Sequence, residues 1–106
     1  MSRSLNNYVK VLLTYDIIPE VRDEYYQFML GEMVPRAETL GLDMVEAWHT
    51  AVGNYPVRLV SFIIESREAA DTALASPDWQ AMEEELQRFV VNYRCRVVPL
   101  RGGFQF

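Results

Sequence analysis

The order of strand-like and helix-like segments along the chain constrains its fold more than any other feature. Strand patterns, in which apolar residues alternate or cluster over short runs, cover residues 8–15, 42–52, 57–65 and 95–100. Helical periodicity fills the two long gaps between them. The sequence therefore predicts the order strand, helix, strand, strand, helix, strand. This is the βαββαβ order of an α+β, ferredoxin-like fold with one four-stranded antiparallel sheet.

The first helical segment begins at Pro19, because proline is well suited to the first turn of a helix. A wide apolar stripe then continues to Leu40, and Gly41 can end the helix in a left-handed conformation. Pro35 has no amide hydrogen to donate to the carbonyl of Gly31. We therefore expect a bent helix with a kink near residues 31–35.

The second helical segment has two start signals. Ser66 can cap a short helix that runs through Leu74, and Ser76-Pro77-Asp78 has the capping hydroxyl, proline and acidic residue of a new helix start. The apolar face of this last helix is predicted from Trp79, Met82, Leu86, Phe89, Val90 and Tyr93. On this pattern the helix extends to residue 93, and Arg94 is its C-terminal cation.

Length and charge limit the classes of function. A chain of 106 residues with 50% hydrophobic residues suits one domain, with a core over about residues 8–100 and a tail at 101–106. A net charge of -5 argues against nucleic-acid binding, which needs clustered basic residues. The only cysteine, Cys95, is expected to be a small buried hydrophobe. No secretory or membrane-spanning pattern is evident, so we expect a cytoplasmic protein without membrane contact.

The predicted topology leaves one face of the sheet without a helix, because right-handed crossovers place both helices on the same side. This open face is predicted to carry the apolar residues Leu12, Trp48, Leu59 and Ile63 and the polar residues Lys10, Thr14, Glu46 and Ser61. Such a surface is too apolar to face water and too polar for a pure core. We therefore expect a homodimer, or a higher oligomer, with a cavity at this face.

The chain resembles the dimeric α+β barrel superfamily. The resemblance rests on the segment order, on Tyr25-Tyr26-Gln27-Phe28 and Val34-Pro35 in the first helix, and on Gly41 before the second strand. Within that superfamily, Gly53-Asn54 and Ser76-Pro77-Asp78-Trp79 are similar to NIPSNAP-like proteins. The resemblance implies that two sheets pair face to face into a barrel. It also implies a range of activities that includes monooxygenases, dismutases and isomerases, with no agreed reaction for the NIPSNAP-like branch.

His49 is the first candidate for proton transfer, because histidine titrates near neutral pH. Glu46 lies three residues earlier, and this spacing places the two on opposite faces of a strand, so the pair is not a metal motif. A structural role for His49, and an ion pair between Glu46 and Lys10 or an arginine, are the alternatives. The candidate ligand-binding residues are Lys10, Thr14, Trp48 and Ser61 on the open face, with Tyr15 at a cavity mouth.

The favoured hypothesis is a homodimer that binds a small apolar or aromatic molecule between its sheet and helices. It would be a cofactor-independent monooxygenase or isomerase, with His49 as base and Glu46 as orienting group. A non-catalytic dimerisation or protein-interaction module is the alternative. A regulatory ligand sensor is a third hypothesis, which predicts binding without turnover. No metal or cofactor is expected.

Overall fold

The computed structural model describes residues 7–50 and 57–100. The strands are β1 (Val9–Ile17), β2 (Asp43–Thr50), β3 (Val57–Ile64) and β4 (Val90–Pro99). The helical elements between β1 and β2 are η2 (Pro19–Val21), α1 (Arg22–Phe28), η3 (Met29–Met33) and α2 (Val34–Thr39), and those between β3 and β4 are α3 (Arg67–Ala75) and α4 (Pro77–Leu86). The predicted βαββαβ order is confirmed. Residues 51–56, which include Gly53-Asn54, and the tail at 101–106 lie outside the described residues.

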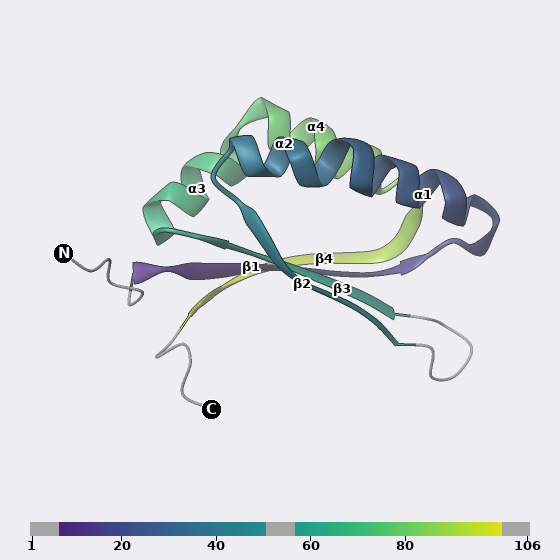
Figure 1. Cartoon of the computed structure of the whole chain (residues 1–106), viewed down its shortest axis with the longest axis horizontal. Coiled ribbons are helices and arrows are strands. Elements are labelled where there is room, and N and C mark those ends of the chain that lie inside the picture. Colours follow the sequence, from purple (N-terminus) through teal and green to yellow (C-terminus); the bar gives the residue numbers. More distant parts are fainter. Residues whose placement is uncertain (1–6, 51–56, 101–106) are drawn as a thin grey trace.

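The four strands form one antiparallel sheet in the order β2-β3-β1-β4, and all the helices lie on one side of it (Figure 1). This is the ferredoxin-like arrangement that the segment order predicts. The two edge strands are β2 and β4. Pro99 lies at the end of edge strand β4, where its missing amide hydrogen costs no hydrogen bond inside the sheet.

The core lies between the sheet and the helices. Alternate residues of β1 are buried against the helices, as the period of two predicts, and Val11 and Leu13 are fully buried. From β3, Val60 and Phe62 enter the same core, where the Phe62 ring meets the Trp79 ring edge to face. The prediction that Trp79 is a core residue is therefore confirmed.

The predicted bend of the first helix takes the form of a π-helical turn, η3. In this turn the amide of Val34 donates a hydrogen bond to the carbonyl of Met29, which lies five residues earlier. Pro35 follows at once and has no amide hydrogen, so the ordinary helical pattern could not continue through Gly31. The helix resumes as α2 and ends at Thr39, and Gly41 follows with a φ of 91°, a left-handed conformation that suits glycine.

The last helix is shorter than predicted, because α4 ends at Leu86 and Val90 already begins β4. The amide of Phe89 donates to the carbonyl of Leu86 in a turn between them. Val90 and Tyr93 therefore belong to a strand, and Arg94 is not a helix C-terminal cation. The helical spacing was misleading here, since the β-branched residues after Phe89 gain more by pairing with β1.

Two β-bulges modify the strands. One lies in β2 between Met44 and Glu46, so Met44 pairs with Phe62 on the helix-covered side while Glu46 stays on the open face. Met44 and Glu46 therefore lie on opposite sides of β2, although an unbroken period of two would place them on the same side. The other bulge lies in β4 opposite Tyr15, at Asn92, whose φ is 59°.

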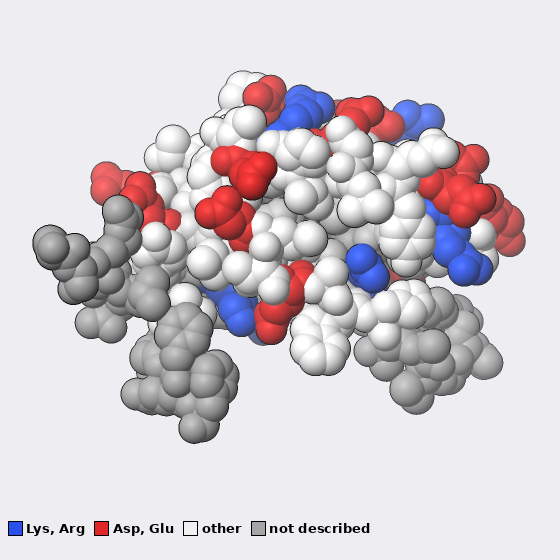
Figure 2. Space-filling view, viewed as in Figure 1, with Lys and Arg blue, Asp and Glu red and all other residues white. Residues whose placement is uncertain are grey.

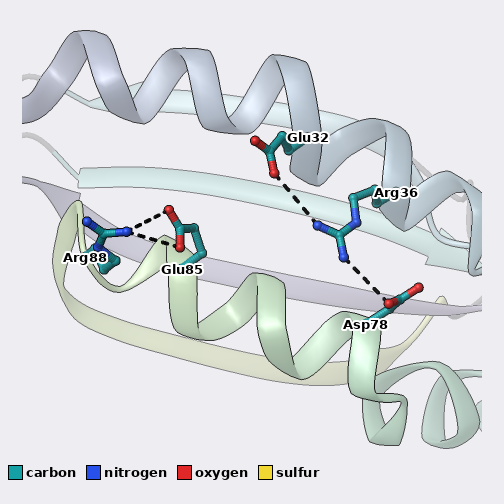
Figure 3. A network of polar contacts seen from close by, with 5 residues as sticks. All are labelled: Glu32, Arg36, Asp78, Glu85 and Arg88. Atoms are coloured by element: carbon teal, nitrogen blue, oxygen red, sulfur yellow. Dashed lines mark hydrogen bonds and ion pairs between the residues drawn. The ribbon is translucent and has the colours of Figure 1, made fainter.

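Charged residues gather over the helical layer in the view of Figure 2. Arg36 of α2 joins Glu32 to Asp78 at the start of α4, and Arg88 pairs with Glu85 near its end (Figure 3). These exposed pairs contribute at most about 1 kcal/mol each. Within residues 7–50 and 57–100, no helix combines the length and apolar character required to span a bilayer.

Candidate functional site

The open face of the sheet brings together most of the residues singled out from the sequence. The strand register sets them in rows across the sheet. Trp48, Leu59, Thr14 and Arg94 form one row; Glu46, Ser61, Leu12 and Arg96 the next; Asp43, Ile63, Lys10 and Val98 the third. No described helix covers this face (Figure 1). The face therefore combines apolar and charged side chains, as predicted.

A polar network lies at the centre of these rows. The Ser61 hydroxyl donates to Oε1 of Glu46 over 2.7 Å. The Lys10 ammonium reaches the same oxygen over 3.3 Å, although Lys10 lies on β1 and β3 separates it from Glu46. The Lys10 side chain thus crosses β3 to complete the network. The ion pair between Lys10 and Glu46, an alternative at the sequence level, is present.

Ser61 is fully buried even though it belongs to the open face. A buried hydroxyl is costly unless it has a hydrogen-bond partner, and Glu46 supplies one. The Ser61 hydrogen bond is the main cause of a lowered pKa at Glu46, and the Lys10 ammonium lowers it further. Glu46 therefore stays ionised at neutral pH. A carboxylate with a lowered pKa is a weak general base and a good hydrogen-bond acceptor.

Large apolar side chains surround the network and remain accessible. Trp48 is 62% exposed, and the side chains of Val57 and Val91 are exposed as well. Isolated exposed apolar residues are ordinary, but here they share one sheet face with Leu12, Leu59 and Ile63. A contiguous surface of this kind is typical of an interface.

The structure does not bring His49 or Tyr15 to this face. His49 pairs with Arg58 in a row that continues to Tyr15, and this row lies on the helix-covered side. His49 is exposed and Tyr15 is 1% exposed. Glu46 and His49 point to opposite sides of β2, so Glu46 cannot orient His49 within one subunit. Tyr15 lines the core and not a cavity mouth on the open face.

The space between sheet and helices is largely filled. Val11, Leu13, Met33, Phe62 and Leu86 are all completely buried there. The surface hollows found in the described residues lie elsewhere. One of about 460 Å³ is lined by Leu40 and by residues at the start of α3, and a neighbouring one of about 260 Å³ lies by Gly41 and Asp43. The second hollow touches one end of the open face, at Asp43 and Ile63, but neither hollow is lined by Glu46, Trp48 or Ser61.

Arg58 was not among the candidate residues taken from the sequence. It meets Tyr15 and the tyrosines of α1 on the helix-covered side of the sheet. Its position in the sequence could have indicated this, because Arg58 is a charged residue on the same face of β3 as the apolar Val60 and Phe62. No group of three or more His, Cys, Asp or Glu side chains in the described part of the chain could hold a metal ion.

Comparison of the sequence with protein-family models and with curated proteins finds no match. Solved structures, however, match over nearly the whole chain. A NIPSNAP family protein from Agrobacterium tumefaciens str. C58 aligns with a TM-score of 0.68 and 16% identity over 99% of this chain and 95% of its own. A NIPSNAP-like domain protein from Burkholderia xenovorans aligns with a TM-score of 0.66 and 18% identity over 95% and 90%.

A third structure belongs to a Caulobacter crescentus CB15 protein whose name assigns it provisionally to antibiotic biosynthesis monooxygenases. It aligns with a TM-score of 0.67 and 11% identity over 90% of this chain and 91% of its own. At such identities the likeness concerns the backbone fold. The chain therefore shares with these solved proteins the α+β, ferredoxin-like fold, in which a four-stranded antiparallel sheet carries its helices on one side.

Proposed function

We propose that two copies of this chain pair through their open sheet faces and enclose a cavity that binds a small apolar or aromatic molecule. The observation that carries the proposal is the composition of that face. An exposed tryptophan and several aliphatic side chains surround a closed network of Lys10, Glu46 and Ser61. Burial against a second copy removes the apolar surface from water and keeps the charged pair internally satisfied.

Each polar residue has a definite role in this proposal. Trp48 offers a large ring for contact with an aromatic ligand. Lys10 and Thr14 provide donors at the same face, and Ser61 holds Glu46 ionised as an acceptor for a ligand hydroxyl. This arrangement, with few polar groups in an apolar setting, is typical of small-molecule sites.

The names of two solved structures with this fold suggest a class of reaction. One neighbour is named as a possible oxidoreductase and another carries a monooxygenase name. We propose cofactor-independent oxygenation or isomerisation of an aromatic compound as the activity to test. The lowered pKa of Glu46 favours hydrogen bonding to substrate over proton abstraction by this carboxylate.

Sedimentation equilibrium at micromolar concentration tests the assembly. The wild-type chain should sediment as a dimer, and Trp48→Ser should shift it toward monomer. Leu30→Ser is the matched control, because Leu30 is 68% exposed but lies on the helical layer. A monomeric wild type, or equal weakening by both substitutions, would refute pairing through the open face.

Ligand binding and turnover are tested separately on the dimer. Naphthols and hydroquinones are suitable probes, because they are aromatic, carry hydroxyl donors and react with oxygen. Binding should raise the melting temperature, and Glu46→Gln or Trp48→Phe should reduce that rise. Oxygen consumption without added cofactor would support the oxygenase. Assembly without any binding would support the non-catalytic dimerisation module instead.

A further inference from the structure

The charged residues of the open face are divided by sign between its two edge strands. On this face the charged side chains are Asp43 and Glu46 on β2, Lys10 and Asp16 on β1, and Arg94 and Arg96 on β4. The side chains that β3 contributes to the face are uncharged, and β1 carries one charge of each sign. The β2 edge is therefore acidic and the β4 edge, on the other side of the sheet, is basic.

Both edges carry charge that their own subunit leaves unused. Arg94 and Arg96 are exposed, and neither forms an ion pair with another residue in the part of the chain that the structure describes. The same holds for the exposed Asp43 on β2. Glu46 holds its two partners through one oxygen, Oε1, although a carboxylate has about four acceptor positions. Glu46 can therefore accept from a further donor.

The symmetry of a face-to-face pair allows two orientations when the strands of the two sheets are roughly aligned. If the two-fold axis runs along the strands, β4 of one copy lies over β2 of its partner. If the axis runs across the strands, β2 lies over the partner's β2 and β4 over the partner's β4. Only the first orientation brings the basic edge to the acidic edge. The second places like charges over one another, which is unfavourable.

We infer that two copies pair with β4 of one over β2 of the other, and that Arg94 and Arg96 fix this orientation. The inference rests on the pairing under Proposed function and adds the arrangement of the two copies. Charge complementarity of this kind determines the register of an interface more than its affinity. Because the interface is symmetric, each contact between the edges occurs twice.

The rows of the open face identify the contacts. Arg96 and Glu46 lie in one row, at its opposite ends, and Arg94 and Trp48 lie at opposite ends of the next. An axis along the strands carries each residue across the face and not along the strand direction, so each row approaches itself. Arg96 then pairs with the partner subunit's Glu46. Arg94 meets the exposed indole of the partner subunit's Trp48, a favourable contact between a cation and an aromatic ring.

This orientation also completes the proposed ligand site. Each side of the enclosed space combines Glu46 and Trp48 of one copy with arginines of the other. A ligand bound beside Trp48 thus contacts residues of both subunits. One copy alone supplies the acceptor and the ring, and its partner supplies the guanidinium groups.

Charge reversal at one edge tests the orientation in the full-length chain. Arg94→Glu with Arg96→Glu places acidic edges over one another, so sedimentation equilibrium should show a dimer dissociation constant at least about tenfold above that of wild type. Arg67→Glu with Arg88→Glu is the matched control. It changes the net charge equally but breaks only exposed ion pairs on the helix side, and should leave the constant within about twofold.

Reversal of the second edge in the same chain should restore pairing. Asp43→Lys and Glu46→Lys make β2 basic, and Lys10→Glu, added with them, preserves an ion pair between positions 10 and 46. Together with the two β4 substitutions, these should return the dissociation constant to within a few-fold of wild type. A dimer as strong as wild type after reversal of β4 alone would overturn the inference, because that result belongs to like edges facing each other. Failure of the second reversal to restore a folded dimer would also overturn it.

Cross-linking tests the orientation without reversing any charge. In a Cys95→Ala background, which removes the native thiol, chains with Glu46→Cys and chains with Arg96→Cys are mixed and treated with a short bismaleimide. Links should form between positions 46 and 96 of different chains. Links of each variant with itself, or no mixed link in a dimeric sample, would overturn the orientation and leave the pairing intact. A monomeric wild type would instead refute the pairing under Proposed function and this inference with it.

Discussion

The Ser61 hydroxyl donates a hydrogen bond of 2.7 Å to Glu46 across the β2–β3 strand pair. This contact joins a fully buried hydroxyl to a carboxylate that remains partly accessible. Lys10 reaches the same carboxylate from β1. The three residues come from three strands, so the network forms only when the whole sheet is paired.

Ser61→Ala should raise the pKa of Glu46, because the lost hydrogen bond is the largest cause of its lowered value. Carbon-detected NMR titration of the carboxyl group in wild type and variant measures the change. Thr14→Ala is the control, since Thr14 lies on the same face without a hydrogen bond to Glu46 among the described contacts. An unchanged pKa in Ser61→Ala would contradict this role.

The lowered pKa of Glu46 also predicts how stability depends on pH. Glu46 binds its proton less readily in the folded protein than in the unfolded chain. Ionised Glu46 therefore stabilises the fold at pH values above its unfolded pKa, and this stabilisation is lost as the pH falls through its folded pKa. The free energy of unfolding should therefore differ most between wild type and Glu46→Gln near neutral pH. Since the carboxylate is 37% exposed, we expect a difference below about 1 kcal/mol. Urea titrations at neutral and acidic pH measure it, and a difference that grows on acidification would contradict the assignment.

Three of the six tyrosines should titrate late in alkali. Burial is the main cause of the raised pKa of Tyr15, Tyr25 and Tyr93, and the hydrogen bond that Tyr93 donates to Glu83 adds to its rise. When folding raises the pKa of a tyrosine, that tyrosine contributes its full stabilisation at pH values below its unfolded pKa, which is near 10. The stabilisation is then lost as the pH rises from the unfolded pKa through the folded pKa. Ultraviolet absorbance should show these three ionising only as the protein unfolds. Reversible ionisation of all six tyrosines near pH 10 in the folded protein would rule this out.

Trp79→Ala should cost about 3–5 kcal/mol of stability, because it removes a large buried side chain that contacts Phe62. Leu30→Ala should change stability by less than about 0.5 kcal/mol, because Leu30 is mostly exposed. Guanidinium denaturation monitored by circular dichroism compares the two. Similar losses from both substitutions would contradict the tight packing of Trp79 against Phe62.

The position of Lys10, Glu46, Trp48 and Ser61 on one sheet face could be predicted from the sequence, because side chains alternate with a fixed period of two along a strand. Met44 broke the pattern, since a bulge adds one residue to β2 and moves Met44 to the other side. Nothing in the local sequence marks that bulge. It follows from pairing with β3, which is a contact between distant residues.

The sequence by itself determined the segment order, the apolar side of β1 and the bend before Pro35, because each depends on local periodicity or on the covalent structure of one residue. Tertiary structure alone decided where α4 ends, which carboxylate partner Lys10 reaches, and how Arg58 meets Tyr15, Tyr25 and Tyr26. These features depend on which strands become neighbours and on side-chain contacts across them. Local propensity carries no information about such pairings, because their free energy arises between residues that are far apart in the chain.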